Sequence, residues 1–430
     1  MMIYEWSSLT SEERESLLER PALDVADQLK ATQAIIDEVR SGGDAALASL
    51  TQKFDRCIPQ SLQVDSVTIR EAAENVDSQL KASISDAADR IREFHSADVP
   101  RDNNIETTPG LVCSVRYQAL DPVGLYVPGG TAPLISTILM LAIPAKLAGC
   151  ENIVLCTPPG DDGRVPAEIL AAADFCGVDN VFCVGGAQAI AAMAYGTGSI
   201  PRVSKIFGPG NSWVTTAKQL VSQHPRGCAI DMPAGPSEVV VIADAQADAQ
   251  FTAWDLLAQA EHGPDSQVLL LTDSDGLARD VARQLRAIAP GLPRASVLES
   301  SLRAARLIVV DDMRAAMEIS NRYAPEHLII NSQNARELAL AVKNTGSVFI
   351  GAWTPESLGD YCSGTNHVLP TYGWARSYGA LGVSDFMRRM TLQEASFDAL
   401  ERIGPTAEVL AQTEGLEAHR MAVRCRLGKN

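Results

Sequence analysis

The sequence predicts an α/β fold with two Rossmann-like, incompletely doubly wound lobes, an N-terminal helical segment and a C-terminal helical tail. Two series of short β-type apolar runs are separated by helix-length segments, and helical periodicity flanks them on both sides. Such alternation is typical of strand–helix–strand units in parallel sheets. A chain of 430 residues is long enough for roughly two to three domains with cores of their own.

The N-terminal quarter is predicted to be helical from Leu23 to about His95. Apolar residues recur at intervals of three and four, as in Val25–Lys30 and again from Ile69 onward. The run Ser41-Gly42-Gly43 predicts a helix end, followed by a new start at Asp44.

The strands are expected in two groups. The first group is Asn152–Cys156, Asn180–Val184 and Ser204–Phe207. The second is Glu238–Ala243, Gln267–Thr272, Arg306–Val310, Leu328–Asn331 and Ser347–Ile350. We expect the boundary between the two sheets in Asp231–Pro236, and a helical tail from Asp385 onward in which Gly404-Pro405 separates two helices. Because this tail is too small for its own core, it is expected to dock on another surface, such as a second subunit.

Bulk composition excludes several classes of protein. The net charge of −17 argues against a general nucleic-acid or anionic-membrane binder, which needs a basic face. Nine scattered cysteines without a Cys-x-x-Cys favour reduced thiols in the cytoplasm. The N-terminus lacks the pattern of a signal peptide. The apolar stretch Ala132–Ala148 is interrupted by Pro133, Pro144 and Lys146, so it indicates a buried helix and not a membrane span.

Glycine- and proline-rich loops follow or precede several expected strands. They are Tyr126–Gly130, Val184–Gln188, Phe207–Asn211 and Met232–Glu238. Glycine at a strand-to-helix turn lets the backbone approach a ligand, so these loops indicate phosphate or nucleotide binding, although each alone is equally well a tight turn. No Gly-x-Gly-x-x-Gly, Walker A, His-Glu-x-x-His or Gly-x-Ser-x-Gly motif is present. A dinucleotide would therefore be held in a non-standard way, or not at all.

The chain has only six histidines, and two of them directly follow a glutamate, in the pairs Glu261-His262 and Glu326-His327. Imidazole binds metals or accepts a proton near neutral pH, and an adjacent carboxylate can tune either task. The pairs thus indicate a metal site and a base, against the alternative that they lie by chance on solvated helices.

The first pair has a possible co-ligand in Gln259, three residues before His262 on an expected helix and therefore on the same face. The remaining ligands of a metal would have to come from elsewhere. Candidates occur in three segments: Leu358–Tyr361, Thr365–His367 and Glu414–His419.

Taken together, these segments resemble the histidinol dehydrogenase family in order and wording. The resemblance is carried by Gly124–Gly130, Val184–Ala189, Phe207–Asn211, Asp231–Glu238, Gln259–Asp265, Pro325–Leu328 and Ser363–Thr371. It extends from about Ala119 to His419. Several long motifs in one order are far more specific than any one of them.

The resemblance implies an activity and a role for each matching residue. The family reaction is two successive NAD-dependent oxidations, from L-histidinol through L-histidinaldehyde to L-histidine. Zinc ligands are implied at Gln259, His262, Asp360 and His419, and an acid–base pair at Glu326 and His327. Substrate contacts are implied at Ser237, His367 and Glu414 and at the zinc-site residues and His327, and NAD contacts at Tyr126, Gln188 and Asn211.

The resemblance also implies a homodimer in which the tail bearing His419 enters the partner's site. We expect a discontinuous lobe on the NAD side from residues 1–24, 127–236 and 367–381. The lobe on the substrate and metal side is expected from residues 25–126 and 237–366, and the tail from residues 382–430.

Three alternatives stay open at the level of sequence. The chain could oxidise another small amino alcohol or polyol, or it could be a nucleotide-binding regulator that lost turnover. The second oxidation could also use a thiohemiacetal on Cys150 or Cys156, although a buried structural thiol is the expected role of both.

Overall fold

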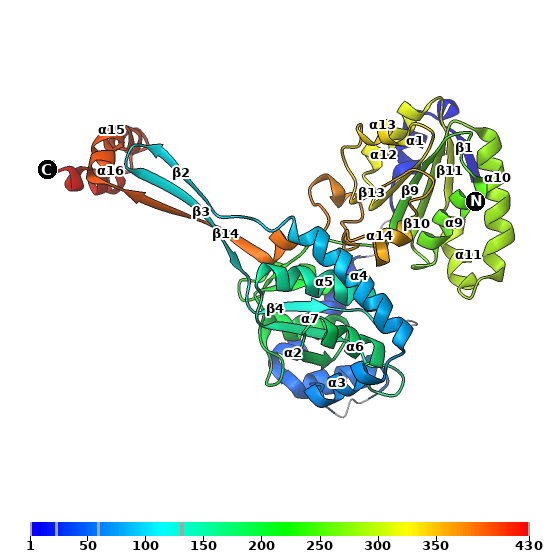
Figure 1. The fold of residues 1–430 in the computed structure, drawn as a ribbon, viewed down its shortest axis with the longest axis horizontal. Helices are drawn as coiled ribbons and strands as arrows, with labels where there is room; N and C mark the ends of the chain where they lie inside the picture. The colour runs from blue at the N-terminus through cyan, green and yellow to red at the C-terminus, as the bar shows by residue number, and fades with distance from the viewer. Residues whose placement is uncertain (1, 22–24, 58–60, 130–132, 429–430) are drawn as a thin grey trace.

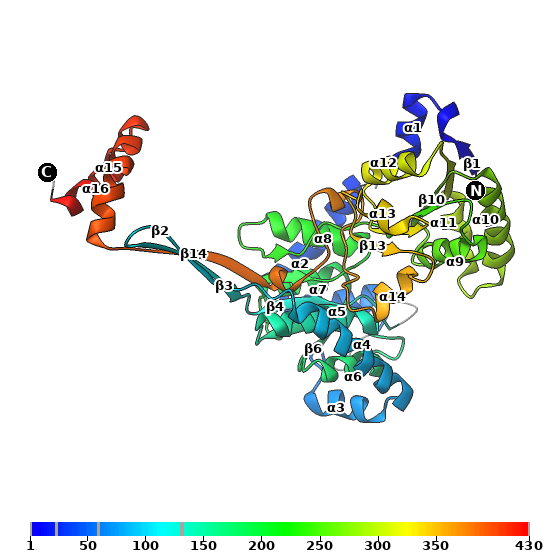
Figure 2. The ribbon, with the colours of Figure 1, turned by 45° about the horizontal axis from the view of Figure 1, so that its top comes forward.

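The computed structural model describes residues 2–21, 25–57, 61–129 and 133–428. It has two α/β lobes and an arm that extends from them (Figures 1 and 2). Leu23, where the helical segment was expected to begin, and Gly130 of the first glycine-rich loop lie outside the described residues.

The first lobe is built on a parallel sheet in the order β6-β5-β4-β7-β8. Its strands are β4 (Val123–Tyr126), β5 (Ile153–Thr157), β6 (Asn180–Cys183), β7 (Lys205–Phe207) and β8 (Ala229–Ile230), and they alternate with α5 (Ile135–Ala148), α6 (Ala167–Phe175), α7 (Gly186–Tyr195) and α8 (Ser212–Gln223). The strands expected here are confirmed, and so is the buried helix α5. The chain fills the sheet on one side of β4 and then crosses to the other, so the loops after β4 and β7 are neighbours at the carboxyl edge.

The second lobe has a parallel sheet in the order β1-β11-β10-β9-β12-β13. Its strands are β1 (Met2–Glu5), β9 (Glu238–Ala243), β10 (Gln267–Thr272), β11 (Arg306–Val309), β12 (His327–Asn331) and β13 (Ser347–Ile350). Its helices are α1 (Ser11–Leu18), α9 (Ala249–Ala260), α10 (Asp275–Ile288), α11 (Ala295–Arg303), α12 (Met313–Tyr323), α13 (Ala335–Ala339) and α14 (Glu356–Tyr361). All the strands expected for this sheet are confirmed, and β1 is an additional edge strand.

The N-terminal segments belong to the opposite lobes from those expected, because residues 1–24 were expected in the first lobe and residues 25–126 in the second. The edge strand β1 pairs with β11 of the second lobe, which places the start of the chain there. The helices α2 (Val25–Phe54), α3 (Ser66–Asn75) and α4 (Ser78–Ser96) pack on the first lobe, where Ile36 and Leu47 join its core. Helical periodicity shows that a face is buried, but the partner of that face depends on tertiary packing. Val368 and Leu381 also pack in the first lobe.

The expected break in the long N-terminal helix is a kink. Gly43 has a φ of 55° and a ψ of −135° inside α2, a backbone conformation that glycine adopts readily. The chain resumes helical geometry directly after it.

The arm combines segments from both halves of the chain. The strands β2 (Asn103–Thr108), β3 (Leu111–Ala119) and β14 (Met387–Ala395) form an antiparallel sheet that leads to α15 (Phe397–Thr413) and α16 (Glu417–Arg424). Figures 1 and 2 show these two helices and the C-terminus at the far end of the arm, away from both lobes. Short 3₁₀ turns complete the secondary structure at Trp6–Ser8, Ala289–Gly291, Trp374–Arg376, Val383–Phe386 and Cys425–Leu427.

Two expectations for the tail were wrong. Helix does not begin near Asp385, because residues 387–395 pair along their whole length with β3, a long-range partner that local sequence does not reveal. Gly404-Pro405 does not separate two helices either, since α15 continues through Pro405 and ends at Thr413. The bare Cα of Gly404 lets α15 pack closely on α16, where an added Cβ would lie 3.0 Å from Val423. Among the described residues, no helix combines the length and apolar character needed to cross a bilayer.

Candidate active site

The site forms where the two sheets approach each other. The segment Asp231–Ser237 connects the carboxyl end of β8 to the amino end of β9, as expected for the boundary between the sheets. It therefore brings the carboxyl edge of the first sheet near the amino edge of the second. Because β12 lies parallel to β9, with His327 opposite Val239, the Glu326-His327 pair is beside Ser237-Glu238 at that edge.

Glu326 and His327 are both buried and both held by the backbone of Glu238. The N–H of Glu238 donates to Glu326 Oε2 at 2.8 Å, and its carbonyl oxygen lies 3.3 Å from His327 Nδ1. A carbonyl only accepts, so this second contact is a hydrogen bond when Nδ1 carries the proton, which leaves the lone pair on Nε2. Within the described chain Nε2 has no hydrogen-bond partner, and it lies 3.8 Å from Asp360 Oδ1.

Burial sets the protonation of this pair. Desolvation lowers the pKa of His327 to about 3, with a smaller contribution from His262, so the imidazole is neutral at physiological pH. Desolvation also raises the pKa of Glu326 well above its usual value. A neutral imidazole beside a carboxyl group held this way is suited to proton transfer.

A buried ion pair lies behind the acid–base pair. The guanidinium of Arg20 donates to both carboxylate oxygens of Glu238, the second at 2.8 Å, and to the carbonyl oxygen of Tyr323 at 2.9 Å. The N–H of Tyr372 donates to the same carboxylate at 3.0 Å. These bonds fix the residue whose backbone holds Glu326 and His327.

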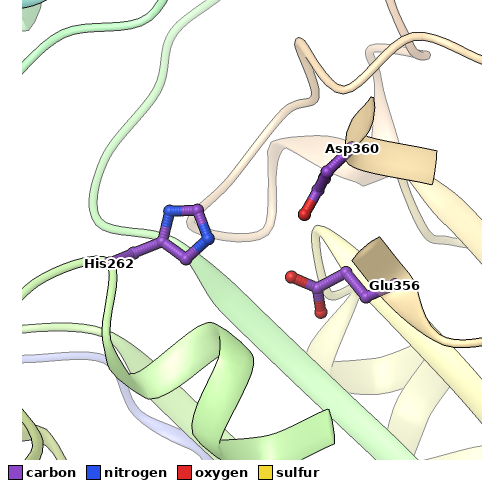
Figure 3. A group of neighbouring side chains, drawn as sticks. All are labelled: His262, Glu356 and Asp360. Atoms are coloured by element: carbon purple, nitrogen blue, oxygen red, sulfur yellow. The ribbon is translucent and has the colours of Figure 1, made fainter. Parts of the chain in front are cut away.

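Three side chains near His327 form a candidate cation centre. One ligand atom from each of His262, Glu356 and Asp360 lies within 4.8 Å of the others, and Figure 3 shows the three side chains pointing toward one another. Imidazole nitrogen and carboxylate oxygen are ordinary zinc ligands. Desolvation raises the pKa of Asp360 to about 7.

Gln259 lies next to this centre, although not quite as expected. It is fully buried in the last turn of α9, whereas His262 lies beyond the helix end in a turn where its N–H donates to the Gln259 carbonyl at 3.2 Å. The two residues are therefore not on one helical face, and His262 is exposed in this single chain.

The carboxylates of the centre come from the short helix α14. Glu356 and Asp360 are four residues apart and so lie on one face. Gly359 lets that helix approach β13, since an added Cβ would lie 2.6 Å from the ring of Phe349. His367 follows in the chain, with Nδ1 2.8 Å from the Asp360 carbonyl oxygen, and its pKa is lowered to about 4 by burial.

The residues expected to contact the nucleotide lie in the loops of the first lobe. Tyr126 is buried at the end of β4, and its hydroxyl accepts from the N–H of Gly186 at 3.0 Å. Gln188 is buried in the first turn of α7. Asn211 caps α8, where its side chain accepts from the N–H groups of Trp213 and Val214. All three lie at the carboxyl edge of the sheet.

A second buried ion pair fixes the loop after β7. Asp231 is paired with Lys218 and accepts from the N–H of Gly208 at 2.8 Å, while Lys218 donates to the Gly208 carbonyl at 2.8 Å. Gly208 has a φ of 120°, and an added Cβ would lie 2.1 Å from the carbonyl oxygen of Tyr126. Only glycine fits here, so the loops after β4 and β7 touch through backbone alone.

Two expected site residues are not brought to the site within one chain. Glu414 and His419 are exposed on the arm, at the end of α15 and in α16, and the arm projects away from the lobes (Figure 1). The thiols of Cys150 and Cys156 are buried in the first lobe, as expected for structural cysteines, and burial raises the pKa of Cys150 to about 12.

Three residues at the site were missed from the sequence: Arg20, Glu238 and Glu356. Glu238 ends the glycine-rich loop Met232–Glu238 and begins an expected strand, and neither pattern predicts that its backbone holds two side chains of the site. The four-residue spacing of Glu356 and Asp360 was a usable signal for a pair of carboxylates on one face. Nothing local marks Arg20, whose partner is 218 residues away.

The fold and site define an α/β protein with a buried Glu-His pair, an adjoining candidate cation centre and glycine-rich loops at the carboxyl edge of its first sheet. The family model described as histidinol dehydrogenase matches residues 18–427. Histidinol dehydrogenases of Vibrio parahaemolyticus and Escherichia coli are each 50% identical to this chain, over 429 and 426 residues, covering 99% of it and 98% and 97% of their own lengths. The crystal structure of histidinol dehydrogenase from Elizabethkingia anophelis superposes with a TM-score of 0.94 at 42% identity, covering 99% of this chain and 97% of that one. The chain belongs to the histidinol dehydrogenase family.

Proposed function

We propose that this protein catalyses the NAD-dependent four-electron oxidation of L-histidinol to L-histidine through L-histidinaldehyde, with one zinc ion per active site. The observation that carries the proposal is the buried Glu326-His327 pair, placed beside the His262 and Asp360 ligand atoms. The imidazole of the proposed base, His327, thus lies 3.8 Å from the carboxylate of Asp360, a proposed metal ligand.

The donor set fits zinc. Gln259, His262 and Asp360 offer amide oxygen, imidazole nitrogen and carboxylate oxygen, and His419 of the partner subunit would add a second imidazole. The amino and imidazole groups of the substrate could then chelate the zinc held by these residues, which would orient the carbinol carbon. Ser237, His367 and Glu414 would contact the same substrate.

The carboxyl edge of the first sheet fits NAD. Its loops after β4 and β7 flank the point where strand order reverses, which is where open α/β sheets bind nucleotides. Tyr126, Gln188 and Asn211 would contact the dinucleotide, which accepts the hydride in each oxidation.

His327 and Glu326 divide the proton transfers. In the first oxidation, His327 Nε2 takes the alcohol proton as hydride leaves the carbinol carbon, which yields the aldehyde. In the second, Glu326 takes a proton from water as it adds to the aldehyde, and the imidazolium of His327 returns its proton to the aldehyde oxygen, which forms the hydrate. The neutral His327 then takes a hydroxyl proton of the hydrate as the second hydride leaves to a second NAD. The product is the carboxylic acid.

The arm suits a homodimer with shared active sites. Large apolar side chains are exposed along it, including Val409 at 63% and Phe397 at 57%. A monomer would leave these apolar groups in water, whereas a second copy would cover them. The same exchange would deliver Glu414 and His419 to the site of the partner. The nine cysteines are all free thiols, which supports a reducing compartment, the cytoplasm.

The test is the number of NADH molecules formed per L-histidinol, before and after metal removal and zinc add-back. Two NADH per substrate, lost on chelation and restored by zinc, is the expected result. One NADH would overturn the second step, and none would overturn the proposed substrate. In that last case a panel of small amino alcohols and polyols identifies the activity.

A further inference from the structure

Glu356 is a buried carboxylate for which the proposed mechanism has no role. It is 1% exposed, and its nearest polar neighbour is the amide of Gln259. With the amide nitrogen of Gln259 turned toward it, that nitrogen donates to Glu356 Oε1 at 2.9 Å and lies 3.2 Å from Oε2. The same nitrogen has two further neighbours, His327 Nδ1 at 3.0 Å and the carbonyl oxygen of Glu238 at 3.2 Å.

These neighbours select one orientation of the amide. The two Glu356 oxygens and the Glu238 carbonyl oxygen accept hydrogen bonds, so an amide oxygen in the same place would face three acceptors, whereas the two hydrogens of the amide nitrogen can bond to two of them. The amide nitrogen therefore occupies that place, and Oε1 of Gln259 is turned away from Glu356. Buried polar groups require such partners, because an unsatisfied one has lost its hydrogen bonds to water without compensation.

We propose that Glu356 is a positioning residue that locks the Gln259 amide with its oxygen available to the metal, and that it is not itself a ligand. The inference rests on the proposed zinc site. Both Glu356 oxygens lie within 3.2 Å of the amide nitrogen, whereas Asp360 and His262 are the members of the centre that reach solvent in this chain. Substrate and cation arrive from that open side.

The relation has a measurable consequence for metal affinity. Groups that orient a metal ligand typically contribute about 10–100-fold to affinity. Glu356→Ala should weaken zinc binding by a factor in this range, because the amide of Gln259 then rotates freely. Glu356→Gln keeps the volume and one acceptor oxygen, so its loss should be smaller.

A double-mutant cycle on the full-length dimer tests the mechanism, with the zinc dissociation constant measured by competition with a chromophoric chelator. If Glu356 acts through Gln259, Glu356→Ala adds no loss once Gln259→Ala is present. An equal loss in both backgrounds means that Glu356 binds zinc directly and overturns the proposal. Unchanged affinity in both Glu356 variants overturns it as well.

Two controls separate this inference from the function it rests on. Glu299→Ala removes an exposed carboxylate far along the chain and should leave zinc affinity unchanged. If the wild-type protein binds no zinc, the zinc site itself is refuted. If the wild-type protein binds zinc and the Glu356 variants bind it with the same affinity, only the positioning role is refuted. Circular dichroism of each variant establishes folding, and Glu356→Gln carries the test if the alanine variant does not fold.

Discussion

The backbone N–H of Glu238 donates a hydrogen bond to Glu326 Oε2 at 2.8 Å. This bond joins the amino ends of β9 and β12, which are neighbours in the sheet although 88 residues apart in sequence. It holds one carboxylate oxygen of Glu326 beside the imidazole of His327, with Oε2 3.7 Å from Nδ1.

Glu326→Gln should separate the two oxidations. The amide oxygen still accepts from Glu238, so the fold is retained, but the base that activates water is lost. We expect aldehyde formation to persist and acid formation to slow by about 100-fold or more, the usual contribution of a general base. Single-turnover assays with L-histidinol and with L-histidinaldehyde measure the two steps. Equal loss of both steps would show that Glu326 does not act on water.

Mixing two inactive variants should restore activity if active sites are shared. His262→Asn damages the lobe part of the site and His419→Asn damages the arm. In a mixed dimer, one site pairs an intact lobe with an intact arm and the other carries both defects. Random exchange makes half of the dimers mixed, so activity should return to about one quarter of the wild-type value. If His419 served the site of its own chain, the mixture would stay inactive. As a control for histidine replacement, His224→Asn should be active without a partner variant.

Removing Asp231 should destabilise the protein and impair NAD binding. Asp231→Ala leaves the ammonium of Lys218 buried without its partner, which typically costs about 3–5 kcal/mol. It also frees the Gly208 loop, so KM for NAD should rise. Denaturant unfolding and initial rates measure the two effects. The matched double variant Lys218→Met with Asp231→Asn has no unpaired charge and should be more stable than Asp231→Ala, and the opposite order would contradict this account.

His95 should make stability fall in mild acid. It is 1% exposed on α4, stacked edge-on to Phe94, and neither ring nitrogen has a hydrogen-bond partner among the described residues. Desolvation lowers its pKa, so the unfolded chain binds a proton more readily than the folded one. The contribution of neutral His95 to the free energy of unfolding is complete above the pKa of histidine in the unfolded chain, which is about 6.5. It declines as the pH falls toward the lower pKa of the folded state, by no more than about 1.4 kcal/mol per pH unit. Urea unfolding between pH 8 and pH 5 should show a shallower decline for His95→Gln than for wild type, and parallel curves would exclude this role.

The sequence predicted the interior of both sheets because those strands are continuous apolar runs separated by turn residues. Because that pattern is local, it predicts each strand without knowledge of the strand that it pairs with. The family resemblance added Gln259, His262, Glu326, His327 and Asp360 as one group, and the structure brings the side chains of these residues close to one another. Composition and spacing alone do not assign these residues to one site.

Tertiary structure decided what each segment is next to. The strand β14 was expected to be helix, and it is a strand because β3 supplies its hydrogen-bond partners. The N-terminal strand β1 belongs to the second lobe because the edge of β11 is open to it. Arg20 contacts Glu238 across 218 residues of sequence, and Glu356 lies beside Gln259, and no local pattern encodes either contact. The sequence by itself therefore determined the strands, the glycine-rich loops and the reactive residue types, since these follow from local periodicity and side-chain chemistry. Lobe membership, the burial that shifts the pKa of His327, and the distance of the arm from the site depended on long-range packing, which only the folded chain specifies.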